Sequence, residues 1–107
     1  MPEVSSEKLT QLFKLLQREP SDTFLLYGIG MEYKKLGALD KSIEYFDRTI
    51  QADQNYCYAY FQRGQVYEKQ AQSAKAKQSY QEGIAAARRV GDAHAQSELE
   101  GALSMVE

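Results

Sequence analysis

Residues 25–37 read LLYGIGMEYKKLG, and this stretch decides the fold because its glycines can be interpreted in two ways. A dinucleotide-binding turn has glycine at the first, third and sixth positions after a buried strand, since the backbone must approach a pyrophosphate there. Gly28 and Gly30 fill the first and third positions, but Tyr33 stands at the sixth. The neighbouring Leu, Met, Glu and Lys residues form helices readily, and no β-branched run precedes them. We therefore predict a helix here and not a phosphate-binding loop.

Length and composition narrow the classes of protein to which the chain can belong. Its 107 residues suffice for one small domain with a real core. A formal net charge of -2 gives no positive field for a polyphosphate backbone, so we expect no nucleic-acid partner. One cysteine and one histidine cannot form an internal disulfide or a His-rich or Cys-rich metal site, so we expect no metal and no cofactor. The N-terminal residues do not resemble a signal peptide and no run of about 18 apolar residues occurs, which predicts a cytoplasmic protein without a membrane partner.

The same residue types recur 34 residues apart along the chain. Gly30 recurs as Gly64, and Tyr33 recurs as Tyr67. The further pairs are Ser42 with Ala76, Phe46 with Tyr80, Ile50 with Ile84, and Ala52 with Ala86. The same interval leads back from Phe46 to Leu12, so we expect the first helix to be the second half of a unit.

This pattern resembles the tetratricopeptide repeat, a 34-residue helix-turn-helix with a large apolar residue, Leu-Gly, Tyr, Ala, an aromatic residue and Pro at set places. The resemblance covers two full units, residues 23–56 and 57–90. The signature packing positions are filled by Gly30, Tyr33, Ser42 and Phe46 in the first unit, and by Gly64, Tyr67, Ala76 and Tyr80 in the second. The resemblance implies an all-α fold in a single domain, a right-handed superhelical stack of antiparallel helix hairpins with about six helices.

Two departures from the family pattern are visible. Arg63 stands where the family has leucine, and Gln54 and Arg88 stand where it has proline. We expect the methylene stem of Arg63 to lie on the core while its guanidinium reaches water. Without proline, we expect the helices before the later inter-repeat turns to end less sharply than the helix that ends at Pro20.

The recurring glycines require an explanation because glycine inside a helix costs about 1 kcal/mol relative to alanine. We expect Gly30 and Gly64 to face the small residues Ser42 and Ala76 of the following helix, so that the two helices of a hairpin approach closely. Gly28 has no such counterpart, and we expect it on the helix surface.

Caps and turn residues divide the chain into helices. The predicted helices are residues 5–19 as an N-terminal half-repeat behind a serine cap, 22–36, 40–52, 55–70, 74–90, and 92–106 as a C-terminal capping helix. Asp40, Asn55 and Asp92 are the expected N-caps, and Gly91 is the expected end of the long fifth helix. The apolar stripe of the last helix fits the repeat only if two residues are inserted before it.

By the same resemblance, the first helix of each hairpin lines an inner, concave face. The side chains expected there are Phe24, Tyr27, Met31 and Lys34 in the first unit and Tyr58, Phe61, Gln65 and Glu68 in the second, with His94, Ser97 and Glu98 added by the last helix. Rigid aromatic side chains are typical anchors of interfaces. We predict that a peptide or helical segment of a partner protein binds here, with Lys34, Glu68 and Lys69 at the rim. The alternative is that the aromatic side chains pack on one another.

The resemblance also bears on the kind of segment that binds. A subset of the family grips C-terminal carboxylates with Lys, Asn and Arg at set inner positions. This chain has Tyr27, Met31, Tyr58 and Gln62 there, so we expect an apolar or aromatic segment instead.

A second hypothesis is self-association. Because the half-repeat lacks its own first helix, the side of residues 5–19 that bears Leu12 and Leu15 has no partner in the sequence. Either the helix rotates to bury this side, or the side pairs with a second copy in a homodimer. An enzyme is the weakest hypothesis, since Cys57 is expected to be a buried thiol and His94 a surface residue.

Overall fold

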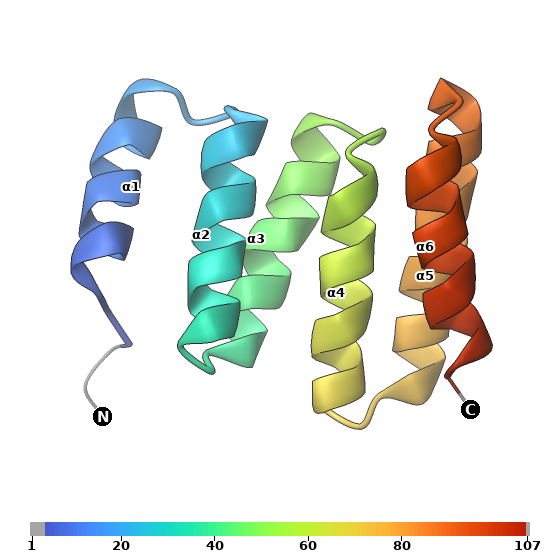
Figure 1. The fold of residues 1–107 in the computed structure, drawn as a ribbon. Helices are drawn as coiled ribbons and strands as arrows, with labels where there is room; N and C mark the ends of the chain where they lie inside the picture. Colours follow the sequence, from blue (N-terminus) through green and yellow to red (C-terminus); the bar gives the residue numbers. More distant parts are fainter. Residues whose placement is uncertain (1–3, 107) are drawn as a thin grey trace.

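The computed structural model describes residues 4–106, which form six α-helices and no strand within that range. The helices are α1 (Glu7–Arg18), α2 (Thr23–Lys35), α3 (Leu39–Ala52), α4 (Cys57–Lys69), α5 (Ser73–Val90) and α6 (Ala93–Ser104). Consecutive helices run antiparallel, and α2, α4 and α6 form a front layer with α3 and α5 behind it (Figure 1). The all-α prediction is confirmed. Across residues 4–106, no helix is both long enough and apolar enough to cross a membrane.

Side-chain caps begin three of the helices, because the first backbone N–H groups of a helix have no partner within it. Ser6 accepts from the N–H of Leu9 at 3.1 Å, and Asp22 accepts from the N–H of Leu25 at 3.0 Å. Asp92 caps α6 in the same way, as predicted.

Two predicted N-caps are wrong. The N-cap of α3 is Ala38, which leaves Asp40 inside the first turn, where it accepts a hydrogen bond from Gln70 at 2.8 Å. The N-cap of α4 is Tyr56, and the Asn55 side chain instead accepts from the guanidinium of Arg89 at 2.9 Å. Both side chains are drawn away from the helix end by partners about 30 residues later, which local capping preferences cannot anticipate.

The recurring glycines face aromatic rings and not small residues, so that prediction is wrong. A Cβ built on Gly30 would lie 2.7 Å from the ring of Phe46, and one built on Gly64 would overlap the ring of Tyr80. The expected partners Ser42 and Ala76 are also fully buried. Each glycine therefore leaves a notch that the aromatic ring of the following helix fills, which accounts for the 34-residue pairing of glycine and ring.

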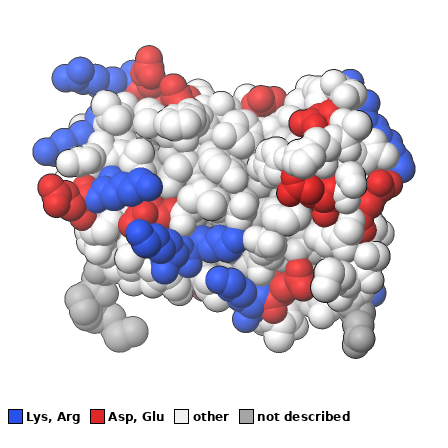
Figure 2. All heavy atoms as spheres, in the orientation of Figure 1, with Lys and Arg blue, Asp and Glu red and all other residues white. Residues whose placement is uncertain are grey.

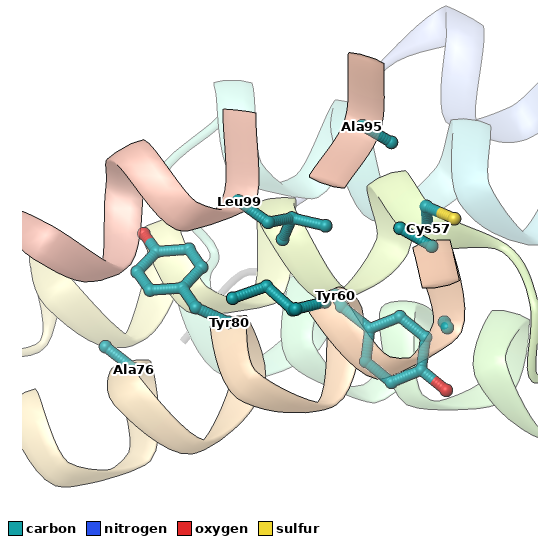
Figure 3. Close-up of a cluster of buried hydrophobic side chains, with 9 residues drawn as sticks. Cys57, Tyr60, Ala76, Tyr80, Ala95 and Leu99 are labelled. Carbon is teal, nitrogen blue, oxygen red and sulfur yellow. The ribbon is translucent and has the colours of Figure 1, made fainter. Parts of the chain in front are cut away.

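The core is divided into two clusters of buried side chains. The N-terminal cluster comprises Leu9, Leu16, Leu25, Leu26, Ile29, Tyr33 and Tyr45, with Leu12 and Phe13 packed against it. The C-terminal cluster comprises Cys57, Tyr60, Ala76, Tyr80, Ile84, Ala86, Ala87, Ala95 and Leu99. Figure 3 shows Leu99 of α6 directed toward this second cluster, beside the rings of Tyr60 and Tyr80. Each cluster joins three helices, so a single hairpin does not bury its own apolar face.

The last helix follows the repeat with a shift of two residues. Thr23 and Ala93 are the first residues of α2 and α6, and they lie 70 residues apart instead of twice 34. The difference arises because α5 has 18 residues where α3 has 14, while the turn that follows is two residues shorter. When Thr23 and Ala93 are aligned as the first residues of α2 and α6, Glu100 takes the position that Gly30 has in α2. The outer face of α6 therefore carries an exposed carboxylate at the position where a following helix would approach.

A pair of glycine substitutions tests the notch. Gly64→Ala should destabilise the fold by about 1 to 3 kcal/mol, because the new methyl meets the buried ring of Tyr80 and overpacking outweighs the gain in helix propensity. Gly101→Ala is the matched control inside α6, where nothing lies within 4 Å of the added Cβ, and it should stabilise by about 0.5 to 1 kcal/mol. Urea denaturation measures both. Equal effects of the two substitutions would contradict the notch.

Candidate functional site

A lysine bridge joins α2 and α4 on the front layer. The ammonium of Lys34 donates to the side-chain oxygens of Gln62 at 2.5 Å and Gln65 at 2.7 Å. Burial, and then the charge of Lys69, lower the pKa of Lys34. Tyr27 also hydrogen-bonds to Gln62, while burial raises the pKa of its hydroxyl. Three of the predicted groove residues, Tyr27, Lys34 and Gln65, are thus joined with Gln62 in one network.

Tyr27 serves both the core and the surface. Its ring lies 5.8 Å from that of Phe46 and 5.0 Å from that of Tyr56, measured between centroids. The side chain is half-buried, as is that of Met31 one turn later on the same helix face. Tyr27 therefore packs on other aromatic rings and still presents part of its surface to the solvent.

A second group of aromatic side chains lies toward α6. Phe61 packs between Tyr58, at 6.4 Å, and Tyr80, at 6.1 Å between ring centroids. The hydroxyl of Tyr58 donates to Glu98 at 3.0 Å, and the hydroxyl of Tyr80 donates to Glu68. These bonds fix both carboxylates at the edge of the aromatic group.

An open hollow of about 390 Å³ lies between α4 and α6 beside this group. Its lining residues are Phe61, Gln65, Glu68, Tyr80, Glu98, Ala102 and Met105. Four of the residues predicted for the inner face, Phe61, Gln65, Glu68 and Glu98, thus meet at one depression. The structure adds Tyr80, Ala102 and Met105, which are not among the residues predicted for the groove. We define the groove as the front surface of α2, α4 and α6 from Tyr27 to this hollow.

Phe24 makes none of the ring contacts of the groove. Its side chain is 75% exposed, and it lines a different hollow with Leu15 and Leu25 near the turn between α1 and α2. The grouping of Phe24 with the other predicted groove aromatics is therefore incorrect.

The two leucines proposed for self-association behave differently. Leu12 packs against the N-terminal core, and a Cβ on Gly28 would lie 3.9 Å from its side chain, so both residues belong to the contact between α1 and α2. The expectation that Gly28 is only a surface residue is wrong. Leu15 remains 51% exposed.

Arg63 is tied to three partners and does not extend freely into water as expected. Its guanidinium donates to Asp47 at 2.8 Å, to Glu82 at 2.5 Å and to the hydroxyl of Ser79 at 2.9 Å. Only 13% of the side chain is exposed, and it lies over the ring of Tyr60. The two carboxylates raise the pKa of Arg63 against the opposing effect of burial. This network lies behind the groove and joins α3, α4 and α5.

The remaining reactive groups have the positions predicted for them. Cys57 is buried, and its burial, followed by the charge of Asp92, raises the pKa of the thiol, which makes it a poor nucleophile. His94 is exposed, with Nε2 2.5 Å from the carboxylate of Glu98. In the part of the chain that the structure describes, no three His, Cys, Asp or Glu side chains are arranged to hold a metal ion.

Charges are unevenly distributed over the front face. Figure 2 shows basic side chains gathered in its lower part over α2 and α4, and acidic side chains gathered on the side of α6. The groove therefore has a basic end over α2 and an acidic end at α6.

Comparison with known proteins agrees with this geometry. Two models of the tetratricopeptide repeat match residues 25–56 and 45–78, which together span half of the chain. The chain belongs to the tetratricopeptide repeat family. The TPR repeat-containing protein PA0015 of Pseudomonas aeruginosa is 26% identical over 88 residues, which cover 82% of this chain and 84% of that protein.

Solved structures of tetratricopeptide domains superpose on most of the chain. A tetratricopeptide repeat domain protein of Salinibacter ruber has a TM-score of 0.74 at 28% identity and covers 78% of this chain and 85% of its own. The TPR2B domain of yeast Sti1, solved in a complex with pHsp70, has a TM-score of 0.84 at 16% identity, covering 90% of this chain and 77% of its own. The second likeness shows the fold alone. The solenoid architecture predicted from the repeat is confirmed.

Tyr80 provides a test that depends on pH. Burial, followed by the hydrogen bond and charge of Glu68, raises its pKa well above the ordinary value of 10.0. The unfolded chain therefore releases the hydroxyl proton of Tyr80 at a lower pH than the folded chain does. The stabilisation that Tyr80 contributes is fully present below pH 10.0 and is lost as the pH rises through the folded pKa. Between about pH 8 and about pH 11 the free energy of unfolding should therefore fall less steeply in Tyr80→Phe than in the wild type. Urea denaturation across this range measures the two slopes, and parallel slopes would contradict the assignment.

Proposed function

We propose that the protein binds a peptide or helical segment of another protein in the groove of α2, α4 and α6, without catalysis. The tetratricopeptide fold is generally a module for protein–protein interaction. The single observation that supports the proposal here is the row of half-buried aromatic side chains, Tyr27, Tyr58 and Phe61, each of which keeps part of its surface on the face that the repeats leave open.

The groove side chains are already ordered without a ligand. Tyr27 is held by two rings and Gln62, Tyr58 by Glu98, and Lys34 by two amide oxygens. Binding therefore costs little additional side-chain entropy. Aromatic surface held in this way favours a segment with apolar or aromatic side chains.

Truncation of the groove tests this proposal. Peptides selected from a random phage-displayed library against the wild type should bind Met31→Ala plus Tyr58→Ala at least about tenfold more weakly, because apolar contact area is lost. Fluorescence anisotropy with synthetic peptides gives the Kd. Both side chains are half-buried; Met31 lies outside both core clusters and Tyr58 packs only on the edge of the C-terminal one, whereas alanine at Tyr27 and Phe61 would remove packing against Phe46 and Tyr80.

The control for this experiment is Leu36→Ala plus Val90→Ala, which truncates two exposed apolar side chains outside the groove. It should leave the Kd within about twofold of the wild type. Equal affinity of the groove variant and the control variant would exclude the groove as the binding site.

A second candidate function is self-association through the N-terminal end. Leu15 and Phe24 are exposed there and line an open hollow of about 420 Å³. The same hollow is lined by Arg18, Glu19 and Asp22, so both signs of charge that an isologous contact could pair are present beside the apolar surface.

Light scattering tests this candidate. The wild type should show twice the chain mass of 12.2 kDa as its concentration rises from about 10 µM to about 200 µM. Leu15→Glu should remain monomeric, since a carboxylate would be buried without a partner in the contact. Val90→Glu adds the same charge at another exposed apolar site and should dimerise normally. A monomeric wild type would reject this candidate and leave the groove proposal untouched.

A further inference from the structure

The hollow between α4 and α6 differs chemically from the rest of the groove. Its walls are largely apolar, yet two carboxylates stand at its edge, those of Glu68 and Glu98. We infer that this hollow receives an arginine or lysine side chain of the segment that binds in the groove, an inference that rests on the proposed function.

The apolar walls fit the stem of such a side chain. The rings of Phe61 and Tyr80 lie 6.1 Å apart between centroids, and Ala102 of α6 and Met105, the residue after this helix, line the same hollow. Met105 is 81% exposed, so much apolar surface is available to a ligand. Methylene groups of lysine or arginine pack on surfaces of this kind while the cation remains at the edge, and aromatic rings attract a cation as well.

The carboxylates are positioned but their charge is not neutralised by a strong base. The hydroxyl of Tyr80 orients Glu68, and the hydroxyl of Tyr58 and the imidazole of His94 orient Glu98. Among residues 4–106, no lysine or arginine forms an ion pair with either carboxylate. Lys34 is turned toward Gln62 and Gln65 instead. The hollow therefore has two fixed acceptors for a cation from outside.

Other occupants fit less well. An acidic side chain would meet two like charges, and an apolar side chain would cover the carboxylates without giving them a partner, which costs free energy. The basic end of the groove over α2 also disfavours a second cation there. The charges thus orient the bound segment, with its cationic residue at α6.

A selection experiment tests the inference. Random 12-residue peptides displayed on phage are selected against the wild type, against Glu68→Gln plus Glu98→Gln, and against the control Glu44→Gln plus Glu100→Gln. The control removes the same charge from two half-exposed glutamates outside the groove. Arginine or lysine should be enriched at one peptide position by about threefold or more with the wild type and the control, and not with the groove variant. Glutamine retains an acceptor for the tyrosine hydroxyls, and circular dichroism checks that each variant folds.

A second measurement uses only the wild-type protein. In a selected synthetic peptide, arginine is replaced by citrulline, or lysine by norleucine, and the Kd should rise at least about tenfold. Peptides that bind without a preferred cation, or a cation preference unchanged in the groove variant, would overturn this inference and leave the proposed function standing. A failure to select any peptide would overturn both.

Discussion

The contact between a glycine of one helix and the aromatic ring of the next sets the geometry of the whole stack. In each hairpin, the glycine lets the two helices approach until the aromatic ring of the second helix lies against the backbone of the first. The pairs are Gly30 with Phe46 and Gly64 with Tyr80. A side chain at either glycine would meet this ring at less than contact distance, so the ring or the helix would have to move. The cost of two glycines inside helices, about 1 kcal/mol each, is therefore offset by packing that no larger residue permits.

This contact also connects the core with the groove. Tyr80 is fully buried against Gly64, yet its hydroxyl reaches Glu68 on the open face. Tyr27 has the same double role in the first unit, since it packs on Phe46 and hydrogen-bonds to Gln62. The surface proposed for binding is thus positioned by the same rings that hold the hairpins closed.

Sequence periodicity predicted the helices, the repeat and most buried signature residues, because these depend on local propensity and on a spacing of 34 residues. It failed for the partners of Gly30, Asn55 and Arg63. Their contacts lie 16 to 34 residues away in the chain and depend on side-chain rotamers, which a one-dimensional pattern does not contain. Within the predicted groove, periodicity placed Phe61, Gln65, Glu68 and Glu98 together, but it missed Tyr80, Ala102 and Met105, which come from other repeat positions or from the end of the last helix.

The longer α5 shows how a repeat protein can tolerate insertions. Four additional helical residues and two fewer turn residues lengthen the second unit by two, yet α6 begins with an aspartate cap as α2 does. The side of α6 that packs on the core depends on where α6 begins and not on the length of the preceding helix. A boundary between repeats therefore isolates each unit from changes of length in its neighbour. Evolution can lengthen one unit there without having to repack the next.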